Sequence, residues 1–164
     1  MIKKLMQLIK AKTSVKPSVE ASESPWIVPD LELIKLSEGL RLESYLCPAN
    51  KWTIGYGHTS TAHKSMKITK KKANQLLVKD LKWVKDTVDN SVGVALTAGQ
   101  VEAIYSLVYN IGGSAWRKST LLRKLNKEDY DGASAEFNRW NKGSGVVLAG
   151  LVTRRAAETK LFKG

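Results

Sequence analysis

The four prolines of the chain all lie in its first 48 residues, and this distribution constrains the fold more than any other feature. Proline breaks helices because it lacks a backbone donor and clashes with the preceding turn. Beyond Pro48, apolar residues recur at the spacing of about 3.6 that is typical of amphipathic helices. We therefore predict that most of the chain after Pro48 is helical.

The helical pattern divides into separate segments. Residues 69–92 are predicted to form one long helix. Residues 96–113 begin with Thr97 and Gln100 in capping-box spacing and end in a Gly pair, and this segment is predicted to be the most buried helix. Three further helices are expected at 119–126, 130–140 and 151–162, with a loop at 141–150. The long helix is expected to bury one face, made up of Ala73, Leu76, Leu77, Leu81, Val84 and Val88.

Strand signals are confined to the region between Leu42 and Ile68. The stretches ESYLC, KWTIGYG and SMKI are short, and turn-forming residues separate them. The predicted fold class is therefore α+β, with a small β lobe joined by the long helix to a larger helical lobe.

The first 28 residues differ from the rest, since residues 1–16 contain five lysines and no acid and a proline-containing stretch follows. We interpret 1–28 as a basic segment and linker, and 29–164 as the folded domain. Residues 2–10 have the spacing of a short amphipathic helix. We favour a loosely docked terminus over weak contact of residues 1–12 with a membrane surface.

Composition narrows the class of partner. Lys and Arg number 27 against 15 acidic residues, a net charge of +12, which favours an anionic partner such as nucleic acid, a membrane face or a wall polymer. The single cysteine excludes an intramolecular disulfide. No apolar run approaches the ~20 residues of a transmembrane helix, and the N-terminus lacks a signal-peptide core.

A candidate acid precedes the strands. The stretch PDLELIKLSEG is predicted to form a short helix with Asp30 near its start and Gly39 at its end, so Glu38 occupies the last turn. We expect Leu31, Ile34 and Leu36 to bury one side of this helix and to direct Glu38 toward the β lobe. Apolar surroundings there would favour the protonated carboxyl that a general acid needs. The alternative is a solvated surface glutamate.

Four blocks carry a resemblance to a known family. They are SEGLRLESYLCPANKWTIGYGHT, the segment from LTAGQ to LRKLN, EFNRWNK and LAGLVTRRAAE. In these blocks the chain resembles the bacteriophage-type lysozymes, or endolysins, from Leu31 to the C-terminus. The resemblance implies a lysozyme-like fold and hydrolysis of the β-1,4 bond between N-acetylmuramic acid and N-acetylglucosamine in peptidoglycan, without a cofactor or metal.

The family pattern of Glu, then Asp or Cys, then Thr falls on Glu38, Cys47 and Thr53. The resemblance makes Glu38 the acid, while Thr53 could orient a water. Cys47 stands where most members have a carboxylate, and a thiol with a pKa near ~8.5 is mostly neutral at pH 7. Cys47 is either a nucleophile, which we favour, or a water-positioning base. As a packing residue it would be a small buried hydrophobe. Glu43, the nearest other carboxylate, is interpreted as a surface residue.

Other matched residues have weaker assignments. The alignment places Thr59, Tyr109 and Ser119 at substrate-binding positions, although each could equally be a cap or core residue. His58 is expected to be buried and hydrogen-bonded, and its spacing from His63 does not match a zinc motif. Trp140 with Arg139, and the group of Arg154, Arg155 and Glu158, suit helix packing and ion pairing better than catalysis.

The leading hypothesis is a monomeric phage muramidase that degrades the host cell wall. Its partner would be peptidoglycan, with no nucleic acid, and it would wait in the host cytoplasm until a holin-type pore opens. A lytic transglycosylase, which can act with one carboxylate, is the alternative enzyme. A wall-binding or nucleic-acid-binding protein that has lost activity is the alternative outside enzymes.

Overall fold

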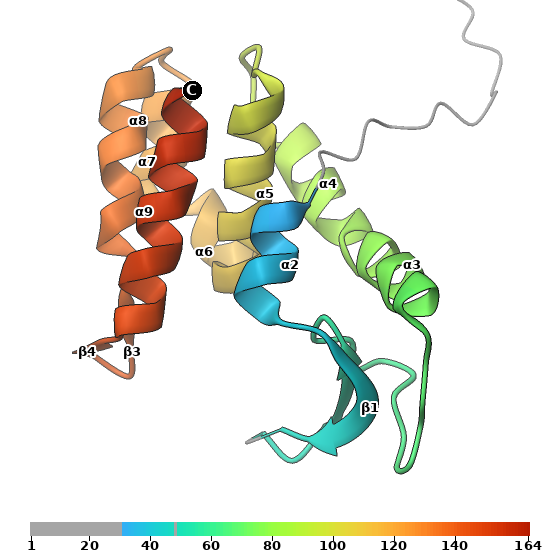
Figure 1. Ribbon diagram of the computed structural model, residues 1–164. Coiled ribbons are helices and arrows are strands. Elements are labelled where there is room, and N and C mark those ends of the chain that lie inside the picture. Colours follow the sequence, from blue (N-terminus) through green and yellow to red (C-terminus); the bar gives the residue numbers. More distant parts are fainter. Residues whose placement is uncertain (1–30, 48) are drawn as a thin grey trace, which may run out of the picture.

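The computed structural model describes residues 31–47 and 49–164. Figure 1 shows the helices packed beside one another, with the β1–β2 sheet at one end of α2 and a second, very short hairpin at one end of α9. In chain order the elements are α2 (Glu32–Glu38), β1 (Arg41–Leu46), β2 (Trp52–Gly55), α3 (Lys70–Asp80), α4 (Lys82–Asp89), α5 (Ala98–Ile111), α6 (Gly113–Arg117), α7 (Thr120–Leu125), α8 (Tyr130–Glu136), the 3-10 helix η1 (Phe137–Arg139), β3 (Lys142–Gly143), β4 (Val146–Val147) and α9 (Ala149–Lys163).

The β lobe is a two-stranded antiparallel sheet. Strand β1 pairs with β2 in a register that sets Tyr45 opposite Thr53. The third predicted strand, SMKI, is reduced to a bridge between Glu43 and Lys67, although the Ile68 N–H donates to the Leu42 carbonyl at 2.9 Å. The predicted small β lobe and larger helical lobe are confirmed.

The predicted helix over residues 69–92 is two helices. Helix α3 ends at Asp80 and α4 begins at Lys82, because Leu81 has a ψ of −8°, a tightened turn of the 3-10 kind that interrupts the regular helix. The predicted apolar face is nevertheless buried throughout, and Leu81 is fully buried. The prediction of a single helix is therefore wrong, whereas the prediction of one continuous buried face is confirmed.

Helix α5 is the centre of the helical lobe. It begins with the predicted capping box, in which Thr97 accepts from the Gln100 N–H and the Gln100 side chain accepts from the Thr97 N–H. All residues from Ala103 to Val108 are buried. Helix α5 packs against α2, α4, α6 and α9. As predicted, it is the central buried helix, with more buried residues than any other described helix.

Two elements were not expected from the sequence. Helix α6 starts directly after Gly112, so the Gly pair ends one helix and begins another, and the buried Trp116 anchors it. The predicted loop at 141–150 contains the β3–β4 hairpin. Its two-residue turn has positive φ at Ser144 and Gly145, the geometry of a type I′ turn.

Helix α2 differs from its prediction on one face. Leu31 and Ile34 are buried, but Leu36 is 79% exposed. Two helical positions are about 200° apart, so Leu36 must lie opposite Ile34. The expectations for Asp30 and for residues 1–28 lie outside the described residues. Within 31–47 and 49–164, no helix is long and apolar enough to cross a membrane.

Candidate active site

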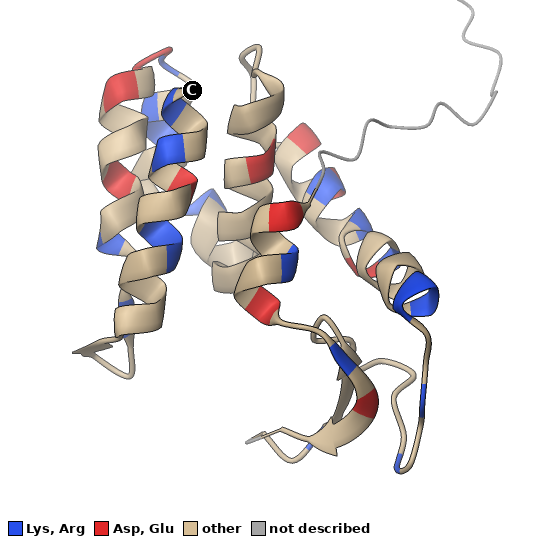
Figure 2. Cartoon of the chain, viewed as in Figure 1, with Lys and Arg blue, Asp and Glu red and all other residues tan. Residues whose placement is uncertain are grey.

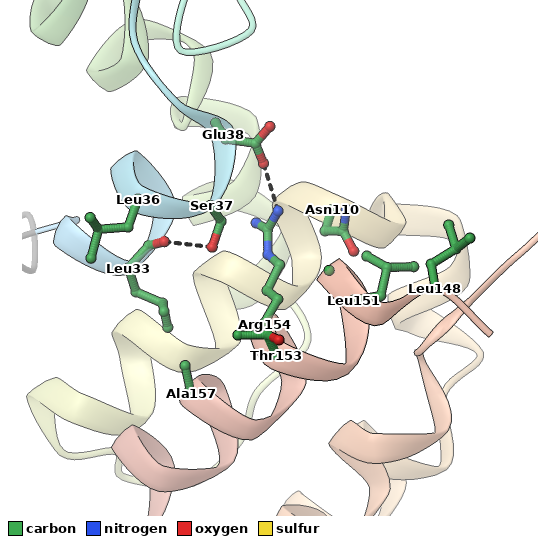
Figure 3. Close-up of a pocket in the computed structure, with 11 residues that line it drawn as sticks. Leu33, Leu36, Ser37, Glu38, Asn110, Leu148, Leu151, Thr153, Arg154 and Ala157 are labelled. Carbon is green, nitrogen blue, oxygen red and sulfur yellow. Dashed lines mark hydrogen bonds and ion pairs between the residues drawn. The ribbon is translucent and has the colours of Figure 1, made fainter.

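The carboxyl group of Glu38 is held by an arginine from the far end of the chain. Glu38 is the last residue of α2, and Gly39, with a φ of 70°, turns the chain toward β1. Figure 3 shows the Arg154 guanidinium reaching from α9 to this carboxyl, where Nη1 donates to Oε1 at 2.7 Å. The Glu38 side chain remains 24% exposed. The expectation of apolar surroundings is therefore wrong at Oε1, where an ion pair with Arg154 orients the Glu38 carboxyl.

Arg154 belongs to a buried charge cluster between α5 and α9. Glu158 lies three and four residues after the two arginines, which places all three on one helical face. The Glu158 Oε1 accepts from the Ser106 hydroxyl at 2.6 Å and from Arg155 Nη2 at 2.8 Å. Burial raises the pKa of Glu158, and both arginines oppose that effect. The predicted ion pairing is confirmed, and it also braces the candidate acid.

A groove with a volume of about 860 Å³ opens beside Glu38. Figure 3 shows side chains from α2, α5 and α9 around it. Glu38 and Arg154 are its charged residues and Asn110 adds a neutral amide. The rest is largely apolar, with Leu33, Leu36, Leu148, Leu151 and Ala157 among the lining residues. The sequence analysis missed Asn110 and the link from Arg154 to Glu38. The sequence offered one signal for this contact: Glu38 and Arg154 lie in two different blocks that match the same family.

Tyr109 and Glu38 both border Gly57. Gly57, with a φ of 96°, brings the chain close to both, since a Cβ there would lie 3.9 Å from Glu38 Oε2 and 3.7 Å from the Tyr109 hydroxyl. That hydroxyl donates to the Tyr56 carbonyl at 3.3 Å. Burial raises the pKa of Tyr109, and the charges of Asp80 and Glu38 raise it further. The Tyr109 hydroxyl and the Glu38 carboxyl therefore line the same stretch of backbone at Gly57.

Cys47 and Thr53 form a second pair in the β lobe. Cys47 follows β1, and its N–H donates to the Lys51 carbonyl at 3.0 Å across the turn. The thiol is half-buried. Hydrogen bonds from the Lys51 backbone and then from the Thr53 side chain lower the pKa of Cys47 below its ordinary value. Thr53 is itself buried, and its hydroxyl donates to the Lys51 carbonyl at 3.1 Å. The hydroxyl has one hydrogen, so the Lys51 carbonyl and the Cys47 sulfur compete for it.

The remaining candidates occupy different surroundings. Within 31–47 and 49–164, the hydrogen bonds and ion pairs join Glu38 to Arg154 and not to Cys47 or Thr53. Thr59 is exposed in the turn after β2. Ser119 is buried as the N-cap of α7, where it accepts from the Leu122 N–H. Ser119 is therefore occupied as a helix cap.

His58 and Glu43 have the structural surroundings that the sequence predicts. His58 is buried, with Nδ1 2.8 Å from Asp80 Oδ2 and Nε2 2.7 Å from the Thr61 hydroxyl. Glu43 is exposed and pairs with Lys67 at 2.7 Å. In the described part of the chain, no three His, Cys, Asp or Glu side chains gather as metal ligands would.

Comparisons with known proteins agree on one family. The model of the family described as phage lysozyme matches residues 35–158. An endolysin of Acyrthosiphon pisum secondary endosymbiont phage 1 is 47% identical, over 81% of this chain and 94% of that protein. An endolysin of Salmonella phage P22 is 40% identical, over 79% and 91%. A solved structure of a P22 lysozyme mutant superposes with a TM-score of 0.78 at 38% identity, covering 82% of this chain and 94% of the other.

Proposed function

The chain belongs to the phage lysozyme family, whose glycoside hydrolases break down the host cell wall, and we propose that Glu38, Cys47 and Thr53 carry its reaction. The bond cleaved is the β-1,4 linkage between N-acetylmuramic acid and N-acetylglucosamine. The observation that carries the proposal is the fixed carboxyl of Glu38, held at 2.7 Å by Arg154 where α2 meets the β lobe.

Glu38 is the general acid of the proposed reaction. Cleavage of a glycosidic bond requires a carboxylic acid that protonates the leaving oxygen as the anomeric carbon gains positive charge. Arg154 contacts Oε1, and Oε2 lies near the backbone of Gly57, where it can face a bound glycan. The ion pair thus determines which oxygen is available for proton transfer.

Cys47 supplies the second group. In one route the thiolate attacks the anomeric carbon, a C–S bond replaces the C–O bond, and the leaving oxygen takes the proton of Glu38. Water then displaces the sulfur and gives its proton to Glu38, with retention of configuration. In the other route the thiolate accepts a proton from a water that attacks directly, with inversion. The lowered pKa of Cys47 and its contact with Thr53 support a thiolate in both routes.

Product analysis tests the reaction class. Purified peptidoglycan digested with the full chain is expected to yield muropeptides with reducing N-acetylmuramic acid ends, detected by mass spectrometry. Products ending in 1,6-anhydro-N-acetylmuramic acid would contradict hydrolysis and favour the transglycosylase. NMR of the anomer released first separates the two routes, since the β anomer requires the thiolate attack and the α anomer requires the direct attack of water.

The basic surface supports an anionic envelope as the site of action. Figure 2 shows Lys and Arg distributed along α3 and α9, and the whole chain has a net charge of +12. We place the protein in the host cytoplasm as a monomer, with residues 1–28 as a basic extension, until a holin-type pore admits it to the wall. Cell fractionation before and after pore opening tests this. Wall-associated enzyme in cells without a pore would contradict it.

A further inference from the structure

An exposed tryptophan stacks on Tyr109, the aromatic residue that borders Gly57 together with Glu38. Trp83 lies in the first turn of α4, and it is 41% exposed. Its ring stacks on that of Tyr109, with centroids 6.4 Å apart and planes 23° from parallel. The hydroxyl of Tyr109 borders Gly57, as the Glu38 carboxyl does, so Tyr109 connects Trp83 to the surroundings of the acid.

The indole of Trp83 has unused binding capacity. Tryptophan is usually largely buried, and its N–H usually has a partner when it is. Trp116 shows this pattern, since it is fully buried and its Nε1 donates to Ser91 at 2.9 Å. By contrast, no hydrogen bond to a described residue involves the Trp83 N–H. Trp83 therefore presents a flat apolar surface and a free donor to solvent.

These two properties match the chemistry of an N-acetylated sugar. One face of a pyranose ring is lined by C–H groups, which pack against flat aromatic surfaces, while its hydroxyl and acetamido groups at the rim accept hydrogen bonds. Tyr109 fixes the orientation of the indole from one side. Trp83 stacks on Tyr109, which borders Gly57 as Glu38 does, so one glycan strand bound at Glu38 can extend to Trp83.

We propose that Trp83 is a glycan-binding platform that holds a sugar remote from the cleaved bond. This inference rests on the proposed function, because the ligand is the same strand whose linkage Glu38 protonates. The platform contributes binding of long strands without contacting the reacting atoms. Its removal should therefore raise the KM for a polymer more than it lowers kcat.

Steady-state kinetics on soluble, peptide-free glycan strands test the platform. Trp83→Ala is expected to raise KM about tenfold, because the loss of one aromatic contact lowers binding affinity by about that factor. The kcat should change much less. Trp83→Phe should restore part of the affinity because it keeps a flat ring. Val78→Ala on α3, where Val78 is 36% exposed, is the matched control and should leave KM unchanged.

Trp83→Leu separates binding from packing. Leucine still covers Tyr109 but offers no flat ring, so KM should rise nearly as much as with alanine. A wild-type KM in Trp83→Leu with a raised KM in Trp83→Ala would show that the side chain only covers Tyr109, and would overturn the proposal. Thermal unfolding of each variant detects any loss of the folded state.

Direct binding gives a readout that is independent of turnover. In the full chain, titration with an N-acetylglucosamine tetramer should shift the indole N–H resonance of Trp83, assigned through Trp83→Phe, while the buried Trp116 resonance stays in place. An unmoved Trp83 resonance together with an unchanged KM in Trp83→Ala would refute the platform and leave the hydrolase intact. Failure of the parent enzyme to release reducing ends would instead refute the proposed function.

Discussion

The two lobes use charged residues in opposite ways. Between α5 and α9, Glu158 and Arg155 are fully buried and Arg154 is 8% exposed. Both arginines pair with Glu158, and Glu158 and Arg154 also bond to Ser106. In the β lobe, the side chains of Glu43 and Lys67 form an ion pair while they are 70% and 73% exposed. The same types of residue therefore make a fixed framework in one lobe and a solvated contact in the other.

This difference separates the two halves of the candidate site. Glu38 is attached through Arg154 to the buried framework, so its carboxyl has one orientation. Cys47 directly follows β1 of a two-stranded sheet that offers little core of its own, and local hydrogen bonds from Lys51 and Thr53 lower the pKa of its thiol. The acid thus depends on long-range packing, whereas the thiol depends on a turn of a few residues.

The largest expected effect is on turnover. Glu38→Gln keeps a side chain that can still bond to Arg154 but cannot supply the proton, so wall hydrolysis should fall by about 10²- to 10⁴-fold. Release of reducing ends from peptidoglycan measures it. Glu43→Gln, an exposed carboxylate of the β lobe, is the control and should retain activity. Equal losses of activity in Glu38→Gln and Glu43→Gln would contradict the assignment of Glu38 as the acid and Glu43 as a surface residue.

The next effect is on stability of the helical lobe. Glu158→Ala leaves two buried arginines without their shared partner, and breaking a buried ion pair in this way costs about 3–5 kcal/mol of the free energy of unfolding. Urea unfolding followed by circular dichroism measures it. A loss under about 1 kcal/mol would mean that the cluster is solvated like a surface pair.

Alkaline pH should weaken the helical core as well. Burial, with the charges of Asp89 and Asp86, raises the pKa of Tyr105 from 10.0 to about 12. The folded state therefore holds this proton longer than the unfolded state, and the stability it contributes is present below pH 10 and lost as the pH rises to about 12. The loss is about 3 kcal/mol. Tyr105→Phe should flatten this decline in urea titrations, whereas Tyr45→Phe, at an exposed β-lobe position, should not.

The smallest effect is expected at the exposed pair. Glu43 raises the pKa of Lys67 through their ion pair, but both groups are in water. Lys67→Ala removes the cation of this pair and leaves the Glu43 carboxylate solvated. The free energy of unfolding should show no measurable change at physiological salt. A destabilisation comparable to that of Glu158→Ala would show that the β lobe also depends on a fixed ion pair.

Local patterns were sufficient to predict most of the fold. The capping box of α5, the apolar face of α3 and α4 and the two-lobed division are properties of short segments, and each was predicted. The break at Leu81, the start of α6 after Gly112 and the turn at Ser144 depend on a few backbone angles to which hydrophobic spacing is insensitive. Leu36 is exposed, against the prediction, because it lies about 200° around α2 from the buried Ile34.

The candidate site was predictable only in part. Glu38, Cys47 and Thr53 lie close together in the sequence, so one motif could identify them. The contact between Glu38 and Arg154 joins residues 116 positions apart, and only tertiary packing reveals it. The same is true of Trp83, whose exposure and stacking on Tyr109 could not be inferred from its place in a helical pattern.

The central claim is that a thiol in the β lobe completes the site of an acid braced by the helical lobe. Turnover of purified peptidoglycan by Cys47→Ala and Cys47→Asp tests it most directly. The account predicts a sharp loss with alanine and largely preserved turnover with aspartate, which restores a negative charge at that position. An alanine variant as active as the parent would contradict the claim and leave Cys47 as a packing residue.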